Sequence, residues 1–552
     1  MPEQTLQLDP RDNVIVALST LEPGTEARYA GSSCPVVQTI PAKQKMALAA
    51  FNPGDLIVMY GMVVGEVVHP IPRGGLITTS NIRHRIGAYT TARQPAPAQI
   101  PDASSWKTRT FLGYHRADGQ VGTRNYWIVV PLVFCENRNV EQMREALEEE
   151  LGYGHANSAY RQRVRKLIHD QKPGAPSFGR SLPEGLESTN SADPDERPFP
   201  NLDGIRFLPH QLGCGGTRQD AQALCGLIAG YIHHPNVAGA TVLSLGCQNA
   251  QSGLLLEQLR ALDPAMRKPV LIFDQQKSGT EAALMEKALD QTVAALAEAN
   301  CAERAPAPLS ALTVGLQCGG SDGFSGISAN PTVGYVSDLV AGSGGKTILS
   351  EFPELHGVEQ ELINRCTTDA LAERFAGLMQ AYAARAHAVQ SDFAFNPSPG
   401  NIRDGLITDA IKSAGAARKG GVSPVSDVID YPEYAKTPGL TLQCTPGNDV
   451  ESVTAQVGAG STLVLFTTGL GTPTGNPIAP VLKISTNTTL AERMSDIIDF
   501  DAGPIVTGEA SAAELGEKLL AISLEVASGI RHTKAEHRGQ VDFIPWKRGV
   551  SL

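Results

Sequence analysis

The sequence of 552 residues lacks a long apolar run and an excess of basic residues. Without an apolar run of about 20 residues, no membrane-spanning helix is predicted. A formal net charge of −11 argues against general binding to nucleic acids or to anionic membrane surfaces. The first residues, Met-Pro-Glu-Gln-Thr-Leu, have neither the basic nor the apolar region of a signal peptide. We therefore expect a cytoplasmic protein without a nucleic-acid or membrane partner.

Cysteines are few, at nine in the whole chain, and no two of them form a Cys-x-x-Cys pair. This number is too small for a disulfide framework, and the spacing alone does not indicate a zinc or iron–sulfur site. Four of them lie at or near predicted strand ends or turns: Cys135, Cys214, Cys247 and Cys318. They are either soft metal ligands or acid–base thiols that share one pocket, or small buried apolar residues.

The length of the chain and its Pro- and Gly-rich breaks predict a multidomain α/β protein. A prior of roughly 150 residues per domain suggests three or four domains. Short apolar runs separated by Pro and Gly predict a small β-rich domain at residues 1–92, and a Pro- and Ala-rich linker follows at 93–108. We expect an α/β domain at 109–395 and a further α/β domain at 396–552, which starts at the sharp break Asn-Pro-Ser-Pro-Gly-Asn.

Apolar, strand-like runs alternate with helical stretches after residue 109. Continuous apolar runs are typical of strands buried on both faces, and helices between them imply parallel pairing, so we expect parallel or mixed sheets with flanking helices. Ligands of open α/β sheets bind at the carboxyl ends of the strands. Polar residues recur at that position, after the runs 126–134, 241–245, 269–273, 309–316 and 347–349. This recurrence predicts an active site.

The stretch 315–331 concentrates glycine, hydroxyl, thiol and carboxylate groups directly after a predicted strand. Glycines let the backbone pass close to a ligand and adopt positive φ without steric cost. Cys318, Ser321, Asp322 and Ser325 suit a small polyhydroxylated or anionic ligand, whose hydroxyl groups Asp322 would orient. The alternative is a tight structural loop of an α/β sheet.

Four further residues have both a functional and a structural interpretation. Glu351, which follows a strand together with Glu354, is a ligand or base, or a solvated loop charge. His210 is a proton shuttle or a satisfied histidine. Lys483 lies in an apolar strand and is either a lysine of lowered pKa or a surface lysine. Arg124 binds a substrate carboxylate or braces the fold.

A set of motifs occurs in a fixed order along almost the whole chain. They are Gly113-Tyr-His-Arg116, Asp118-Gly-Gln-Val-Gly-Thr-Arg-Asn125, Gly213-Cys214, His234-Pro-Asn-Val237, Leu245-Gly-Cys247, Cys318-Gly-Gly-Ser-Asp-Gly323, Asn396-Pro-Ser-Pro-Gly-Asn401 and Gly469-Leu-Gly-Thr-Pro473. In this order the chain resembles the altronate/galactarate dehydratase family, including an N-terminal domain similar to the family's SAF-type module.

The resemblance implies a hydro-lyase that removes water from an aldonic or aldaric acid and yields a 2-keto-3-deoxy acid, usually with Fe²⁺ or Mn²⁺. Such a reaction needs a base, a cation that stabilises the enediolate and an acid that assists the leaving hydroxyl. A small hydroxy acid is the expected partner, and a homo-oligomer is compatible with the sequence. We assign catalysis to Asp322, Glu351, His210 and Lys483, and substrate binding to Arg124, Asn125, Ser321, Ser325, Asn330, Asn401, Thr467 and Thr468.

The chain departs from the family's pattern at motif positions that carry charges or ligands. The family's His-x-His-Asn motif is here Thr78-Thr-Ser80-Asn81, and hydroxyls are poor ligands for Fe and Mn. Ile402 replaces a lysine, Ala410-Ile411 an acidic position, Leu470 an arginine and Gln248 a glutamate. Two alternatives therefore stay open: a related lyase for another 2-hydroxy acid, such as a sulfolactate-type substrate, and a paralogue that binds a sugar acid without turnover.

Overall fold

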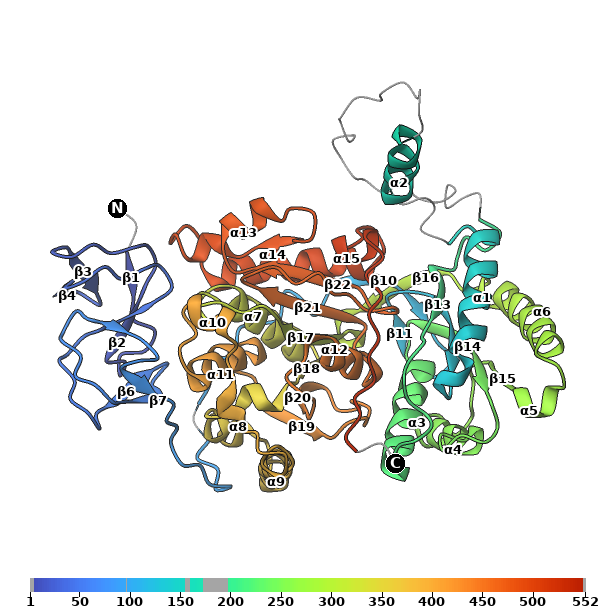
Figure 1. The fold of residues 1–552 in the computed structure, drawn as a ribbon, viewed down its shortest axis with the longest axis horizontal. Helices are drawn as coiled ribbons and strands as arrows, with labels where there is room; N and C mark the ends of the chain where they lie inside the picture. Colours follow the sequence, from blue (N-terminus) through green and yellow to red (C-terminus); the bar gives the residue numbers. More distant parts are fainter. Residues whose placement is uncertain (1–3, 96, 154–158, 172–196, 550–552) are drawn as a thin grey trace.

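Residues 4–95, 97–153, 159–171 and 197–549 are described by a computed structural model. Three units lie side by side in Figure 1: the N-terminal β unit at one end, the C-terminal α/β unit in the middle and the second unit at the other end. This arrangement confirms the expected α/β class with a small β-rich N-terminal domain. Within the described ranges, no helix has both the length and the apolar character that a membrane crossing requires.

The N-terminal unit is built from short antiparallel strands. Frequent Pro and Gly residues end the apolar runs early, which keeps the strands short. The sheets have the orders β1-β2-β5-β8, β3-β4 and β6-β7-β9. The strands are β1 (Thr5–Leu6), β2 (Val14–Ala17), β3 (Glu26–Tyr29), β4 (Ser32–Pro35), β5 (Lys45–Ala47), β6 (Leu56–Met59), β7 (Met62–Val67), β8 (Leu76–Ile77) and β9 (Ile82–Arg83).

The second unit contains a four-stranded parallel sheet with the order β13-β12-β14-β15. A three-stranded antiparallel ribbon, β11-β10-β16, joins it to the C-terminal unit. The strands are β10 (Thr110–His115), β11 (Val121–Gly122), β12 (Tyr126–Pro131), β13 (Gly204–Phe207), β14 (Val237–Ser244), β15 (Val270–Asp274) and β16 (Arg304–Pro308).

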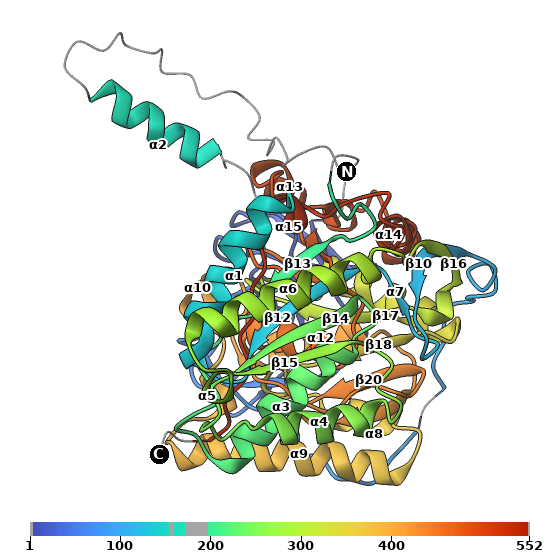
Figure 2. The ribbon, with the colours of Figure 1, turned by 90° about the vertical axis from the view of Figure 1, so that its right-hand side faces the viewer.

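Helices cover both faces of the four-stranded sheet (Figure 2). Trp127 and Val129 of β12 pack in the core with α1 and α6, whereas Ile128 and Val130 pack in the core with α3 and α4. Burial on both faces explains why this strand is continuously apolar in the sequence. The helices of this unit are α1 (Asn137–Glu150), α2 (Ala159–Asp170), α3 (Arg218–His233), α4 (Ser252–Leu262), α5 (Gln275–Ser278) and α6 (Glu281–Ala299).

The C-terminal unit is organised around a seven-stranded parallel sheet with the order β19-β20-β18-β17-β21-β22-β23. Its strands are β17 (Thr313–Cys318), β18 (Lys346–Leu349), β19 (Val425–Ile429), β20 (Gly439–Gln443), β21 (Leu463–Thr468), β22 (Val481–Ser485) and β23 (Phe500–Asp501). Its helices are α7 (Ala329–Gly342), α8 (Glu359–Arg365), α9 (Asp369–Ala388), α10 (Pro399–Arg403), α11 (Asp409–Ala417), α12 (Asp449–Gly458), α13 (Thr488–Arg493), α14 (Ala512–Ala527) and α15 (Lys534–His537).

The division expected at residues 395 and 396 lies inside this seven-stranded sheet. β17 and β18 precede the division, yet β17 pairs with β21 and β18 pairs with β20. The two sheets instead separate between β16 and β17, within the range 109–395 that we expected to be one domain. The alternation of strands and helices continues across both boundaries, so the sequence pattern gives no sign of where one sheet ends.

Close helix packing joins the second and C-terminal units. A Cβ added to Gly230 of α3 would lie 2.1 Å from the carbonyl oxygen of Gly458, the last residue of α12. Leu227 and Tyr231 of α3 share a core with Val453 and Val457 of α12. Glycine at position 230 therefore lets the two helix backbones approach closely, which fixes one unit against the other.

Candidate active site

The glycine-rich loop after β17 is held by its own polar side chains and by the N-terminal unit. The Asp322 carboxylate accepts hydrogen bonds from the Phe324 amide, the Ser325 hydroxyl and the Thr486 hydroxyl, at 3.1 Å each. Lys43 of the N-terminal unit reaches it with an ammonium nitrogen 3.0 Å from Oδ2. Asp322 is fully buried, so this cation supplies much of the compensation for its charge.

Five ionisable or nucleophilic side chains form a buried cluster beside this loop. Cys318 ends β17, whereas Glu351 and Glu354 follow β18. The Lys419 ammonium donates to Cys318 Sγ at 2.7 Å and lies 3.7 Å from Glu351 Oε2. The Lys412 ammonium lies 2.7 Å from Glu354 Oε1, and Cys318 Sγ lies 3.5 Å from Glu354 Oε2. We call this group the Cys318 cluster.

The two glutamates of the Cys318 cluster have opposite pKa shifts. Burial, together with the neighbouring Glu354 carboxylate, raises the pKa of Glu351 well above its usual value. Burial also acts to raise the pKa of Glu354, but Lys412 and Lys419 outweigh it and lower that pKa. Burial raises the pKa of the Cys318 thiol to about 12. These shifts favour a protonated Glu351 beside a Glu354 carboxylate, a Cys318 thiol and two ammonium groups.

The backbone conformation of Glu351 and the surroundings of its carboxylate are also unusual. Its φ is 65°, in the left-handed region that non-glycine residues rarely adopt. Neither of its buried carboxylate oxygens has a well-formed hydrogen bond. Backbone strain and an unsatisfied buried polar group both cost free energy, and such features gather at functional sites.

Six of the expected substrate-binding residues lie together around the glycine-rich loop. Asn401 donates to the carbonyl of Ser321 at 2.7 Å, and Thr467 donates to the Asn330 amide oxygen at 2.6 Å. Ser325 contacts Asp322, as described above, and the Thr468 hydroxyl accepts from the Gly471 amide at 2.9 Å. These polar groups satisfy one another and shape the loop.

Four other expected residues lie elsewhere and are held by structural contacts. Both ring nitrogens of His210 are bound to backbone, and burial lowers its pKa to about 4. Arg124 pairs with Glu536 at 2.8 Å, and the Asn125 amide donates to the carbonyl of Asn201. Burial lowers the pKa of Lys483 to about 8, and its ammonium donates to the carbonyl of Thr474. These contacts brace the fold.

The four expected metal-binding cysteines fall into two groups. Cys318 is buried in the cluster described above, whereas Cys135, Cys214 and Cys247 are exposed. Cys135 lies in the short 3₁₀ helix Phe134–Glu136 after β12, and Cys214 and Cys247 lie on the loops after β13 and β14, so these thiols belong to the four-stranded sheet rather than to the seven-stranded sheet. The expectation that all strand ends share one edge assumed a single sheet.

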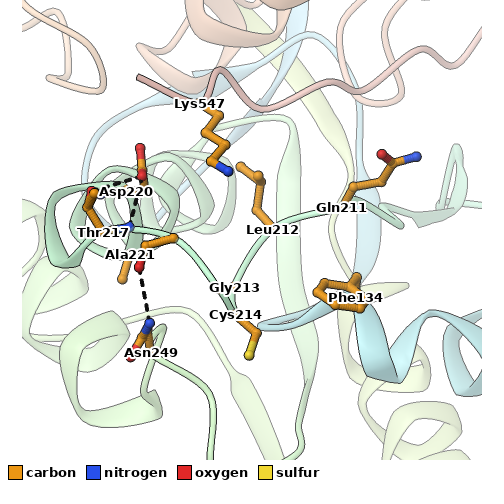
Figure 3. Close-up of a pocket in the computed structure, with 12 residues that line it drawn as sticks. Phe134, Gln211, Leu212, Gly213, Cys214, Thr217, Asp220, Ala221, Asn249 and Lys547 are labelled. Carbon is orange, nitrogen blue, oxygen red and sulfur yellow. Dashed lines mark hydrogen bonds between the residues drawn. The ribbon is translucent and has the colours of Figure 1, made fainter. Parts of the chain in front are cut away.

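A cavity of about 260 Å³ opens beside Cys214 (Figure 3). Figure 3 shows Phe134 and Asn249 near Cys214, while Lys547 of the C-terminal segment extends toward the same space.

Gln248, at the position of the family's glutamate, shapes the loop that carries Cys247. It accepts from the Gly246 amide and donates to the Ser244 hydroxyl, both at 2.7 Å.

A third group joins the segment after the N-terminal unit to the C-terminal unit. His356 and Asp409 form an ion pair at 2.9 Å, and the ring of His84 stacks on His356 with centroids 5.4 Å apart and planes 22° apart. Burial lowers the pKa of His84 to about 4, which leaves this imidazole neutral at pH 7. The group therefore consists of a hydrogen-bonded histidine–aspartate pair, in which Asp409 raises the pKa of His356, covered by a neutral ring.

Sequence reasoning missed the cations of the site. Lys412 lies in α11, and Lys419 lies in the 3₁₀ turn Arg418–Gly420 that follows it; their separation of seven residues in an alanine-rich stretch, about two helical turns, could have identified them. Lys43 gave no comparable signal, because its partner Asp322 is distant in sequence. Asp449 was also missed; Gly319 leaves room for it, since a Cβ there would lie 2.2 Å from the Asp449 carboxylate.

Comparison with known proteins assigns all three units. Residues 3–85 match the altronate/galactarate dehydratase SAF domain. Residues 113–300 match the second domain of D-galactarate dehydratase/altronate hydrolase, and residues 309–551 match the C-terminal domain of D-galactarate/altronate dehydratase. The second boundary agrees with the separation of the two sheets between β16 and β17.

Curated relatives extend over the same range. Altronate dehydratase of Escherichia coli is 32% identical over 554 residues, covering 100% of both chains. Galactarate dehydratase (L-threo-forming) of the same organism is 31% identical and covers 91% of this chain and 89% of its own. The (2R)-sulfolactate sulfo-lyase subunit beta of Chromohalobacter salexigens is 30% identical and covers 79% of this chain and 97% of its own. The chain therefore belongs to the altronate/galactarate dehydratase family.

Proposed function

We propose that this protein is a hydro-lyase, a carbon–oxygen lyase that converts a sugar acid such as altronate to a 2-keto-3-deoxy acid. The observation that carries this proposal is the pair of opposite pKa shifts at Glu351 and Glu354 in a buried cluster that also holds two ammonium groups. Two carboxyl groups whose surroundings push their pKa values apart are suited to act as an acid and a base.

The roles follow from the protonation states. The Glu354 carboxylate takes the proton on the carbon next to the substrate carboxylate, and Lys412 and Lys419 stabilise the enediolate that develops. Protonated Glu351 gives its proton to the departing β-hydroxyl, which leaves as water. The resulting enol takes a proton from solvent at the carbon that lost the hydroxyl and becomes the 2-keto-3-deoxy acid. The loop of Asp322, Ser325 and Asn401 orients the remaining hydroxyl groups.

Two of the candidate groups do not suit the Fe²⁺ or Mn²⁺ that the family resemblance implies. In the Cys318 cluster the Lys412 and Lys419 ammonium groups already contact Glu354 and Cys318 at 2.7 Å, where a cation would lie. His84 and His356 are stacked, so the in-plane lone pairs of their nearly parallel rings do not converge on one ion.

Cys135, Cys214 and Cys247 are the cysteines that suit a metal. Thiolates are ligands that iron accepts and that manganese, which prefers oxygen, does not. We therefore propose iron at these three loops. When bound, iron would supply a Lewis acid at this edge of the four-stranded sheet. Exposed thiols of this kind stay reduced in the cytoplasm, where we place the enzyme.

A second candidate, favoured by the sulfolactate sulfo-lyase relative, is elimination of sulfite from a sulfonated 2-hydroxy acid. A substrate panel separates the two. The purified chain, supplied anaerobically with Fe²⁺, is incubated with altronate, galactarate, other aldonic acids and sulfolactate, and 2-keto acid and sulfite are measured. We expect 2-keto acid from a sugar acid without sulfite. Sulfite release from sulfolactate alone would support the second candidate, and ligand-induced thermal shifts without any product would contradict a lyase.

A further inference from the structure

Each of three neighbouring strands of the second unit is followed by a loop that carries one exposed cysteine. Cys135 follows β12, Cys214 follows β13 and Cys247 follows β14, and these strands are adjacent in the order β13-β12-β14. In a parallel sheet, the loops after the strands all lie at one edge. Three thiols from distant parts of the sequence are thus brought to the same edge.

Direct backbone contacts fix the three loops to one another. The Phe134 amide donates to the carbonyl of Leu212 at 3.0 Å, and the Asn249 amide donates to the carbonyl of Gly213 at 3.0 Å. Gly213 has a φ of +101°, and a Cβ there would lie 2.1 Å from the carbonyl oxygen of Leu132. The loop of Cys214 is therefore clamped between the loops of the other two cysteines.

Within the described ranges, the three thiols are exposed and have no polar partner, whereas Cys225, which also lacks one, is buried in the core. Cys366 and the exposed Cys301 donate to helix carbonyls one turn earlier. Within the part of the chain that the structure describes, no hydrogen bond or ion pair involves the sulfur of Cys135, Cys214 or Cys247. Their thiols are therefore available as ligands.

The spacing of the three sulfurs argues against a single ion. Ligand sulfurs around one tetrahedral ion lie about 3.8 Å apart, given metal–sulfur bonds of about 2.3 Å. Among the described residues, these three sulfurs do not all fall within 4.8 Å of one another. A cluster with several irons bridges thiolates that are farther apart, and thiolates are the usual ligands of iron–sulfur clusters.

We propose that Cys135, Cys214 and Cys247 hold a [4Fe–4S] cluster at this edge of the four-stranded sheet. Cys214 lines the cavity of Figure 3 together with Asn249 and Lys547, and Phe134, which precedes Cys135, lines it as well. Helices α1, α3 and α4 start directly after the loops, and their N-termini favour the negative charge of the thiolates and the cluster. The cluster does not rest on the proposed function.

Anaerobic reconstitution of the full chain with Fe²⁺ and sulfide tests the cluster without reference to activity. We expect about four irons and about four acid-labile sulfides per chain, a broad absorption band in the visible range, and an EPR signal after one-electron reduction. Cys135→Ser, Cys214→Ser and Cys247→Ser are each expected to lose most of this iron and sulfide. Cys301→Ser is the matched control and is expected to retain both, and thermal unfolding of every variant shows whether it folds.

Two results would overturn the cluster. One is a single iron or zinc per chain without sulfide. The other is equal iron and sulfide in the wild type and in folded Cys214→Ser. Either result, together with dehydration of a sugar acid, would overturn the cluster and leave the proposed function intact. A reconstituted cluster with no dehydration of any sugar acid would contradict the proposed function and leave the cluster intact.

Discussion

Glu351 and Glu354 are three residues apart, yet their surroundings give their carboxyl groups opposite protonation states. Glu351→Gln removes the proton donor but keeps a side chain of the same shape. We expect kcat to fall by about 10²–10⁴-fold, the usual contribution of a general acid. Because the pKa of Glu351 is raised, the wild-type rate should fall as pH rises through that pKa. The variant should lose this limb of the kcat–pH profile, whereas the exposed Glu525→Gln should behave like the wild type.

Lys412 compensates the buried charge of Glu354. Replacing Lys412 alone should therefore lower the free energy of unfolding more than replacing both residues. Lys412→Met leaves the Glu354 carboxylate without its nearest cation and is expected to destabilise the protein by about 3–5 kcal/mol. Adding Glu354→Gln should recover part of this loss. Denaturant unfolding of both single variants and the double variant measures the coupling. Additive losses would show that the 2.7 Å pair contributes nothing specific.

At the residue scale, the sequence predicted the polar loop better than the charges around it. Glycines and short polar side chains after a strand identified Asp322 and Ser325, and the family motif supplied Asn401, which donates to the carbonyl of Ser321 in the same loop. For Arg124 the sequence left two roles open, a substrate carboxylate ligand and a brace of the fold, and in the structure it pairs with Glu536. The partner of a buried charge depends on long-range packing, which local sequence patterns do not encode.

At the scale of elements, alanine substitutions of two helix glycines should change the stability in opposite directions. Gly230→Ala places a Cβ 2.1 Å from the carbonyl oxygen of Gly458 and should destabilise the contact of α3 with α12 by about 2 kcal/mol or more. Gly377→Ala in α9 meets nothing within 4 Å and should stabilise its helix by up to about 1 kcal/mol. The two melting temperatures therefore shift in opposite directions. A neutral Gly230→Ala would mean that the helices do not approach as closely as described.

The strands were predictable because burial on both faces leaves a continuous apolar signal, as in β12, β14 and β21. The boundary between the two sheets was not predictable from the sequence. Strand pairing across a sheet is non-local: β18 pairs with β20 although α8 and α9 lie between them in the sequence. A strand and a helix have the same sequence pattern whether they extend one sheet or begin another. For this reason we expected the domain boundary at the wrong place, and we assigned Cys318 and the three cysteines of the four-stranded sheet to one site.

At the scale of the whole molecule, Lys43 ties the SAF domain to the active-site loop. Lys43→Met removes the ammonium 3.0 Å from the buried Asp322 carboxylate. We expect a loss of roughly 1–3 kcal/mol, less than for a fully buried pair, because Lys43 is partly exposed. The SAF domain should dock less firmly, so limited proteolysis within 93–108 should become faster. Arg85→Ala, which removes a surface pair with Glu66, is the control and should leave cleavage unchanged.

The central claim is that the chain dehydrates a sugar acid by acid–base chemistry in the Cys318 cluster. The most direct measurement is an NMR time course of altronate in D₂O with the iron-supplied protein. We predict a 2-keto-3-deoxy acid with one deuterium at C3, because the enol takes its proton from solvent, and a strongly slowed reaction with Glu351→Gln. Altronate that stays unchanged while it binds the wild type, or equal rates for the wild type and Glu351→Gln, would contradict this account.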